Sequence, residues 1–442
     1  MAYTTLNASY SSTLTLTAGT YYMSANVDMN SNTLVFDCSG GDIILKRNGD
    51  VSFTECATIS TTNSDATHKV YYTVKDDDTI GEAITGSSGS PSASGGCLTT
   101  TQVNANVTII WWEIRWANNK QFLYHKPVTT FKLRTFSHIT WKNSTYSSVN
   151  VIYADIWAAG GVNGYTDYIH FDNTNTISGT AGLLVQLNNP VDNCFIQNAN
   201  APDNTVIYKN TFYDTAGTKS FTNIHIEGSS NYGMLVQDIT RTVNFINCDA
   251  KLAVYTTSGS ITAYFKNCLF RSSGNGIVNY NGTNTIHVQN CIFKGCTTAI
   301  YETAGTLTVG GIINSIFDSN TAIFYNTTGT ATYTGIYNNT STTGLTSGTG
   351  CITANPSFGN YNASAVIDTD FGIYGFSNGY VATAAQYQQT GSDTYNNLSI
   401  DETYYSPDGI ARLGTDKVNP GVNYKFTSFA QPDIFEILGI PF

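Results

Sequence analysis

The sequence is poor in charge: Asp, Glu, Lys and Arg make up 12% of its 442 residues, about half the usual fraction. Only 20 residues are Lys or Arg, against 31 Asp or Glu, which gives a net charge of −11. A chain with so little positive charge does not attract a phosphate backbone, so we expect no nucleic-acid partner. No apolar run approaches the ~20 residues that cross a bilayer, so we expect no membrane span.

Residues that favour helices are also scarce, including Met, which occurs 4 times. The chain is instead rich in Gly (39), Tyr (29) and Phe (22), together with many Thr, Asn, Val and Ile. Aromatic and β-branched residues favour strands, whereas Asn and Gly favour turns. With a hydrophobic content of 41%, the composition predicts an ordered, almost purely β protein with a large core.

The nine cysteines show no C-x-x-C spacing, which argues against zinc-ribbon and thioredoxin-like sites. We expect most of them to be buried free thiols that act as small apolar residues. The N-terminus, "MAYTTLNASYSS", has neither a basic nor an apolar segment of a secretory signal. Either a signal was removed, or the protein leaves its cell without one, as virion proteins do at lysis.

A repeat is visible where "FKNCLF" (265–270) is followed by "VQNCIF" (288–293) and "IINSIF" (312–317). Equivalent segments recur every 19 to 30 residues, with Gly228 in the place of Asn in one of them. The Asn residues of this repeat are Asn143, Asn173, Asn198, Asn247, Asn267, Asn290, Asn314 and Asn338. Asn tolerates a left-handed backbone better than other non-Gly residues, so we expect a bend at each position and one structural ladder of stacked Asn side chains.

The residues around each Asn alternate between apolar and polar, which is the pattern of a strand with one buried face. The residue after the Asn is small, and Phe270, Phe293 and Phe317 return to the core three residues after it. The apolar column two residues before the anchor contains Trp141, Phe171, Ile196, Ile226, Phe245, Phe265, Val288, Ile312 and Ile336. These features predict an all-β fold, a right-handed parallel β-helix.

The strand-Asn-strand repeats resemble the pectin-lyase-like family of parallel β-helices. The N-terminal stretch, with an acidic loop beginning at Asp76, is similar to the first coils of surface-exposed β-helix proteins. We expect an N-terminal cap with the first coils at 1–100, regular coils at 101–350, and a loop-rich capping or assembly region at 351–442. The apolar end "FAQPDIFEILGIPF" is interpreted either as part of the cap or as a subunit contact.

The resemblance implies two kinds of enzymatic site, because lyases of this fold use an acidic calcium cluster and hydrolases use paired carboxylates. Asp172 and Glu227, which we place two coils apart, are the candidate catalytic pair. Calcium is the candidate metal, and no other cofactor is expected. Its candidate ligands, which could equally form a solvated acidic loop, are Asp76, Asp77, Asp78 and Glu82.

Aromatic and charged side chains predicted to face outward are candidates for a glycan site or a protein interface. In "IIWWEIRW", alternation places Trp112 and Ile114 in the core and Trp111 outside, beside Glu113 and Arg115. Core packing, an interface and glycan binding all remain open for Trp111. A second outward row is predicted from the residues three before each anchor, and it contains His170, His225, Tyr264 and His287.

The fold supports several functions, so the resemblance leaves the activity open. Our main expectation is a non-enzymatic structural or adhesive β-helix outside the cell, as a phage or virus spike, fibre or capsid decoration that binds surface polysaccharide. We expect it to self-associate into a trimer or a larger assembly. The alternatives are a polysaccharide depolymerase on the same fold and a cell-surface or sheath protein.

Overall fold

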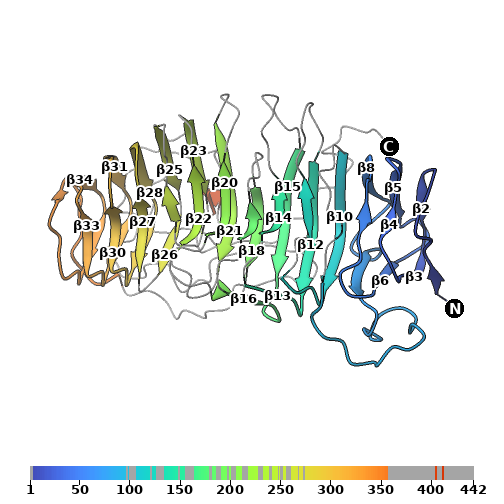
Figure 1. Ribbon diagram of the computed structural model, residues 1–442. Helices are drawn as coiled ribbons and strands as arrows, with labels where there is room; N and C mark the ends of the chain where they lie inside the picture. The colour runs from blue at the N-terminus through green and yellow to red at the C-terminus, as the bar shows by residue number, and fades with distance from the viewer. Residues whose placement is uncertain are drawn as a thin grey trace.

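The computed structural model describes residues 3–95, 98, 106–119, 122–125, 134–147, 150–154, 164–178, 182–185, 191–196, 199–200, 206–211, 218–226, 232–237, 241–246, 248, 252–254, 260–266, 268–271, 274–356, 404–405 and 411–412. Strands are the only regular elements in these residues, and they stack as parallel strands from one end of the molecule to the other (Figure 1). The predicted all-β, parallel β-helix is therefore confirmed. Within the described residues, no helix is long and apolar enough to cross a membrane.

The largest sheet has 18 strands and forms two adjoining faces of the solenoid. Its strands are β1 (Thr4–Thr5), β2 (Leu14–Leu16), β3 (Gly19–Met23), β5 (Thr33–Asp37), β6 (Ile43–Arg47), β8 (Thr58–Thr62), β9 (Val70–Val74), β10 (Asn106–Arg115), β12 (Arg134–Lys142), β15 (Gly164–Phe171), β18 (Val191–Ile196), β21 (Lys219–Ile226), β23 (Arg241–Ile246), β25 (Ile261–Lys266), β28 (Thr283–Gln289), β31 (Thr306–Ile313), β34 (Gly329–Thr332) and β36 (Leu345–Ser347).

The remaining strands complete the coils. A nine-stranded sheet contains β11 (Leu123–His125), β14 (Asn150–Ala154), β17 (Gly182–Val185), β20 (Val206–Thr211), β22 (Tyr232–Gln237), β24 (Leu252–Val254), β27 (Asn275–Asn279), β30 (Thr298–Glu302) and β33 (Ala322–Tyr325). Smaller sets are β4 (Val27–Asp28) with β7 (Phe53–Thr54); β13 (Thr145–Tyr146), β16 (Thr176–Ser178) and β19 (Ala199–Asn200); and β26 (Leu269–Arg271), β29 (Ile292–Lys294), β32 (Ile316–Asp318) and β35 (Gly335–Tyr337). Outside the solenoid strands, β37 (Tyr404–Tyr405) and β38 (Ala411–Arg412) form an antiparallel pair.

Strand β10 shows how two faces become one continuous strand. Its first half pairs with β8, through Val107 and Ile59, and its second half pairs with β9, through Ile114 and Tyr72. In the coil before it, residues 63–69 form a loop between β8 and β9. In β10 that loop is reduced to a single residue, Trp111, with a left-handed φ of 59°. A bend at one residue therefore replaces a loop of seven.

Two such bends occur in each of several coils, and we call them the first and second corners. Their residues with positive φ come in pairs five apart: Trp111 and Trp116, His138 and Asn143, Asn290 and Gly295, Asn314 and Ser319, and Tyr333 and Asn338. Since the same interval recurs in five coils, the short face between the two corners keeps one length along the solenoid.

The single Asn ladder predicted from the sequence is wrong, because its described members belong to both corners. Asn290 and Asn314 lie in the first corner, whereas Asn143 and Asn338 lie in the second. The predicted apolar column breaks in the same way, because Phe245 pairs with Phe221 and not with Ile226. Where either corner contains one of these Asn residues, a left-handed Asn is followed by a small or polar residue (Ser144, Cys291, Ser315 or Asn339), so a repeat anchored on Asn cannot tell the corners apart. Asn198, Asn247 and Asn267 lie outside the described residues.

Asn173 also departs from the ladder. The turn between Phe171 and Thr176 is one residue longer than its neighbour between Trp141 and Thr145. The extra length lets Asn175 donate to the Trp141 carbonyl at 2.7 Å and accept from the Ser144 backbone N–H at 3.0 Å. Asn173 is exposed, whereas Asn175, two residues later, is buried and makes these contacts between coils.

The core consists of side chains stacked in register along the solenoid axis. Phe270, Phe293 and Phe317 are buried and stack with ring centroids 4.4 and 4.8 Å apart, as the sequence predicts. Cys268 and Cys291 fill the tight inner side of the first corner. Eight of the nine cysteines are described: all eight are free thiols, and every one except Cys351 is buried. The predicted capping region at 351–442 lies almost entirely outside the described residues.

Candidate functional site

The acidic loop at 75–95 folds against the outer side of β6, β9 and β10, and two groups of predicted residues meet there. The loop is the blue segment that leaves the row of strands near the N-terminal end in Figure 1. Asp77 from the loop and Glu113 and Arg115 from β10 form one polar network, although the sequence offered no reason to join them. We call this set, with Lys46, Thr73, Thr79 and Lys142, the loop network.

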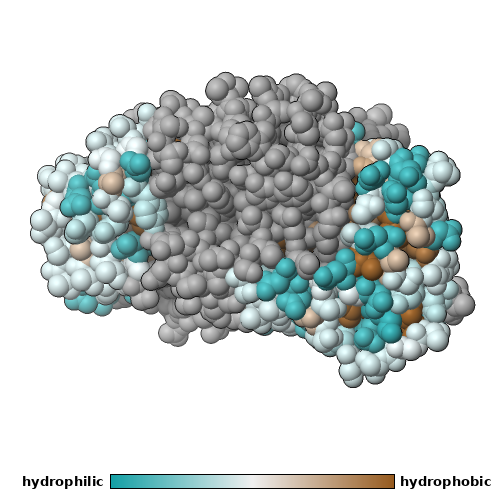
Figure 2. Space-filling model, in the orientation of Figure 1, coloured by the Kyte–Doolittle hydropathy of each residue, from teal (hydrophilic) through white to brown (hydrophobic). Residues whose placement is uncertain are grey.

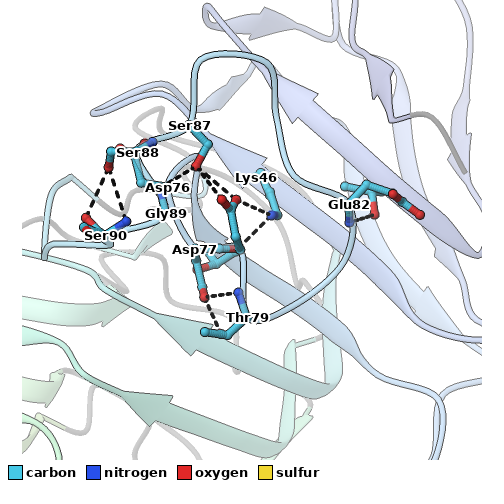
Figure 3. Close-up of polar contacts among 12 residues, drawn as sticks. Lys46, Asp76, Asp77, Thr79, Glu82, Ser87, Ser88, Gly89 and Ser90 are labelled. Atoms are coloured by element: carbon cyan, nitrogen blue, oxygen red, sulfur yellow. Dashed lines mark hydrogen bonds and ion pairs between the residues drawn. The ribbon is translucent and has the colours of Figure 1, made fainter.

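Asp77 is the centre of the loop network and is fully buried. Its carboxylate accepts a hydrogen bond from the Thr73 hydroxyl at 2.7 Å and another from the Thr79 hydroxyl, and it lies 3.6 Å from the Arg115 guanidinium. Its backbone carbonyl accepts from the Lys46 amine at 2.7 Å, as drawn in Figure 3. A buried carboxylate with this many donors is a structural anchor, because each donor offsets its lost hydration.

Glu113 and Arg115 lie two residues apart on the same side of β10 and form an ion pair. The other carboxylate oxygen of Glu113 lies 3.0 Å from the Lys142 amine in β12. The Arg115 guanidinium donates to Thr79 at 3.2 Å and lies 5.9 Å from the ring centre of Tyr71. Alternating charges therefore connect the loop to two successive coils.

Burial and charge act against each other on the cations of the loop network. Burial lowers the pKa of Lys46, and the nearby carboxylates of Asp78 and Asp77 only partly oppose this shift. Burial also disfavours charge on Arg115, but the attraction of Glu113 and Asp77 outweighs it, so the pKa of Arg115 rises. The network therefore compensates the buried charge of Arg115 chiefly through Glu113 of the same strand, with Asp77 of the loop adding to it.

The outer carboxylates of the loop have separate partners. Asp76 accepts from the Ser88 backbone N–H at 2.6 Å, which lowers the pKa of Asp76. Asp78 accepts from the Ser87 hydroxyl at 3.0 Å. Glu82 lies apart from Asp76 and Asp77 in Figure 3. No group of three His, Cys, Asp or Glu residues that could hold a metal occurs in the part of the chain that the structure describes. Calcium binding at Asp76, Asp77, Asp78 and Glu82 stays a prediction.

Trp111, for which core packing, an interface and glycan binding were all open, is fully buried. Alternation assigned the sides correctly, because Trp112 and Ile114 belong to the hydrophobic core cluster and Trp111 does not, but it could not show what covers Trp111. The indole stacks on the His138 imidazole with centroids 4.0 Å apart, and the Lys69 amine lies 5.7 Å from its ring centre. Trp111 is therefore packed inside the chain, in the first corner, rather than presented to a ligand.

The predicted row of His170, His225, Tyr264 and His287 belongs to two different faces. His170 pairs with Thr140 and Phe195, and Phe195 pairs with His225, beyond the first corner. Tyr264 pairs with His287, before that corner, and their rings stack at 4.6 Å. Both rings are half-buried, whereas the side chain of His225 lies outside the description. The structure thus brings only Tyr264 and His287 together.

Asp172, one half of the candidate catalytic pair, holds a turn. Its carboxylate accepts from the backbone N–H of Thr174 at 2.9 Å and from the Thr174 hydroxyl. Ile226, the residue before Glu227, lies two coils from Phe171, the residue before Asp172, as the sequence predicts. Glu227 itself lies outside the described residues, so the catalytic pair stays a prediction.

Lys46, a member of the loop network, and the neighbouring Arg47 are buried cations that sequence reasoning missed. Both are fully buried in β6, Lys46 beneath the loop and Arg47 on the opposite side of the strand. The available signal was "DIILKRN", in which two cations directly follow an apolar strand. Cations at that place need internal partners, because buried charge is otherwise strongly unfavourable.

Comparison with known proteins gives one match. A family model described as a domain of unknown function (DUF7305) matches residues 3–112, which hold the first coils and the acidic loop. Searches of curated proteins and of solved structures each find no match to the chain.

Proposed function

We propose that this protein is a non-enzymatic structural or adhesive β-helix displayed outside the cell, in the form of a virion spike, fibre or capsid decoration. The solenoid is compatible with this role, because stacked coils make a stiff rod with long side faces. The part of the surface coloured in Figure 2 is largely hydrophilic to neutral with small hydrophobic patches, as suits a rod exposed to water.

The observation that carries the proposal is the structural use of the described candidate site side chains. Asp172, one of the two catalytic candidates, caps a turn, and Glu113 and Arg115, candidates for a glycan site or an interface, belong to the network that binds the acidic loop to the rod. Asp77 is enclosed by the donors of Thr73 and Thr79. A general acid or nucleophile must reach its substrate, and these groups are instead directed to other parts of the chain.

Glycan binding in this proposal rests on exposed aromatic rings, since sugars stack on such rings. Tyr325 in β33 is 49% exposed, which makes it the most exposed large hydrophobic side chain of the described residues. Its ring stacks on Tyr301 of the preceding coil with centroids 4.8 Å apart. We therefore assign the surface-polysaccharide contact to Tyr325, rather than to the buried Trp111.

Self-association is tested by light scattering of the purified chain together with negative-stain images. We expect a trimer or a filament, and a monomer at all concentrations would contradict the assembly part of the proposal. The glycan part is tested by binding to a panel of bacterial surface polysaccharides, where Tyr325→Ala should weaken binding at least tenfold. Tyr337→Ala, on another face, is the control. New reducing or unsaturated ends in the panel would support a depolymerase instead.

A further inference from the structure

The turn between β27 and β28 contains an Asn–Gly pair, Asn281 and Gly282 (Figure 1). Asn281 is exposed, and its side-chain oxygen accepts a hydrogen bond from the backbone N–H of Gly282 at 2.8 Å. Gly282 has a left-handed φ of 81°, a conformation that glycine adopts freely. The turn therefore holds the Gly282 nitrogen against the side-chain amide of the residue before it.

The Gly282 nitrogen takes no part in the hydrogen bonds between coils. The carbonyl of Gly282 accepts from the Thr306 N–H of the next coil at 2.9 Å, whereas the N–H of Gly282 is turned toward Asn281. Gly305 of the next coil passes beside this nitrogen, and a Cβ built on Gly305 would lie 2.8 Å from it. Because residue 305 is glycine, no side chain covers the nitrogen on that side.

We propose that Asn281 is an autocatalytic modification site, where the Gly282 nitrogen converts the side-chain amide into a carboxylate. The Gly282 N–H gives its proton to hydroxide, and the nitrogen then attacks Asn281 Cγ. A new bond joins this nitrogen to Cγ, the bond from Cγ to the side-chain nitrogen breaks, and ammonia leaves. Water opens the resulting succinimide ring at either carbonyl, which gives aspartate or isoaspartate.

This reaction is favoured by contact between the reacting groups, because a nucleophile held beside its target needs no further ordering before it attacks. Water and hydroxide are its only co-reactants. The proposal does not depend on the function proposed above.

Three of the five Asn–Gly pairs in the sequence lie in the described residues, and the other two of these three lack this geometry. Asn275 lies within β27, which pairs with β30, and Gly276 is buried, with space for a Cβ blocked by the Ala299 carbonyl at 2.5 Å. Asn48 is exposed, and Gly49 has a φ of 66°. Among the hydrogen bonds of the described residues, however, none joins the Asn48 side chain to the Gly49 nitrogen.

Modification of Asn281 should disturb the contact between two coils. Isoaspartate lengthens the main chain by one carbon, beside a Gly282 carbonyl that is bonded to Thr306. The coils are already close here, since a Cβ on Gly305 would lie 2.2 Å from the Gly282 oxygen. A longer main chain cannot keep both contacts, so the pairing of β28 with β31 should loosen.

The first test is peptide mapping by mass spectrometry after the full chain is incubated at mildly alkaline pH, either folded or in urea. In the folded chain, Asn281 should react several times faster than Asn48 and at least about tenfold faster than Asn275. In urea the three sites should react at similar rates, because the fold no longer distinguishes them. The proposal is overturned if Asn281 reacts no faster than Asn275 in the folded chain, or if urea leaves the order of rates unchanged.

Asn281→Gln is the matched control. It keeps an amide at the surface, but the extra methylene group prevents closure of the succinimide ring, so residue 281 should stay unmodified while Asn48 reacts as before. In the wild type the rate at Asn281 should rise with pH, since only the deprotonated nitrogen is a competent nucleophile. A rate at Asn281 that does not change with pH overturns the proposed route.

The effect on the coils is tested with the modified chain itself. Both products add a negative charge, so anion exchange separates the modified chain from the unmodified one. The chain modified at Asn281 should unfold at a lower urea concentration, whereas Asn281→Gln protein aged in the same way should keep its midpoint. Equal midpoints for the modified and unmodified chains overturn the proposed loosening of β28 from β31.

Discussion

In the coils near residue 110 the first corner is occupied by Trp111, whereas in the coils near residue 300 the same corner is occupied by Asn290 and Asn314. The aromatic corner continues in His138 and Tyr168, and the three rings stack with centroids 4.0 and 4.4 Å apart. Non-Gly residues other than Asn and Asp rarely adopt a left-handed backbone, which costs about 1–2 kcal/mol. The N-terminal corner offsets that strain by ring stacking, whereas the coils of Asn290 and Asn314 reduce it with Asn.

The residue after the corner shows a second difference. In the C-terminal coils this residue is Cys291 or Ser315. Its side chain accepts a hydrogen bond from the backbone N–H of the equivalent residue in the coil before it; the Ser315 hydroxyl, for example, accepts from the Cys291 N–H at 3.1 Å. In the N-terminal coils it is Trp112 or Ile139, which fill the core. Local polar bonds therefore set the C-terminal corner, whereas core packing and the stacking of Trp111, His138 and Tyr168 set the N-terminal one.

The largest effect is expected from removing the anchor of the loop network. Asp77→Ala leaves Arg115 without one partner and the loop without its attachment, so it should destabilise the chain by about 3–5 kcal/mol. Chemical denaturation measures this loss, and proteolysis within 75–95 should become faster. Asp78→Ala removes a side chain that is 32% exposed and leaves Lys46 its hydrogen bond to the Asp77 carbonyl, so it should cost less than Asp77→Ala. Equal losses for the two variants would contradict the anchor role of Asp77.

The aromatic corner should make stability sensitive to acid. Burial lowers the pKa of His138 to about 3, while its unfolded value is about 6.5. The unfolded chain therefore binds a proton that the folded chain excludes. The contribution is complete above about pH 6.5 and falls, by up to tenfold in the folding constant per pH unit, as the pH drops toward 3.

Substituting His138→Asn keeps a residue that tolerates the left-handed backbone and removes the titrating group. Unfolding measured between pH 7 and pH 4 should show a shallower loss of stability in this variant than in the wild type. Parallel pH profiles for the two proteins would show that His138 does not couple stability to pH.

A smaller effect should distinguish the Asn corner. Asn290 has a φ of 52°, so Asn290→Ala should cost about 1–2 kcal/mol, while Asn290→Gly should cost less because glycine adopts this conformation freely. The free energy of unfolding in urea provides the measurement. A loss for Gly as large as for Ala would mean that the Asn290 side chain, rather than its backbone, stabilises the corner.

The smallest effect is expected at the neighbouring thiol. Cys291 accepts a hydrogen bond from Cys268 N–H and is followed in the next coil by Ser315 in the same role. Cys291→Ser should therefore change stability by less than about 1 kcal/mol, whereas Cys291→Val, which cannot accept that bond, should cost more. The reverse order in urea unfolding would show that packing alone governs this position.

The repeat was readable because its physical causes are local. Period-two alternation reports a half-buried strand, and Asn followed by a small residue reports a left-handed bend, so the β-helix and the stacks through Phe293 followed from sequence. The same locality explains the error in the ladder. Both corners need the same backbone conformation, and nothing in a short segment says which of two corners it forms.

Which residues form the loop network could not be predicted from local sequence patterns, because it depends on which coils become neighbours. Asp77 and Arg115 are 38 residues apart in the chain and meet only when the loop folds back over β10. The burial of Trp111, which the sequence left open, has a related cause: its indole lies outside the hydrophobic core cluster and is covered by His138 of the next coil and Lys69 of the coil before it.

The sequence by itself determined the fold class, the corner chemistry and the buried thiols, because strand alternation and left-handed bends are properties of a few adjacent residues. Only the tertiary structure decided the two-corner register, the burial of Trp111, and the placement of Lys46 beneath the loop and Arg47 in the core. Those outcomes depend on electrostatic and packing contacts between coils, and such contacts exist only after the coils have stacked.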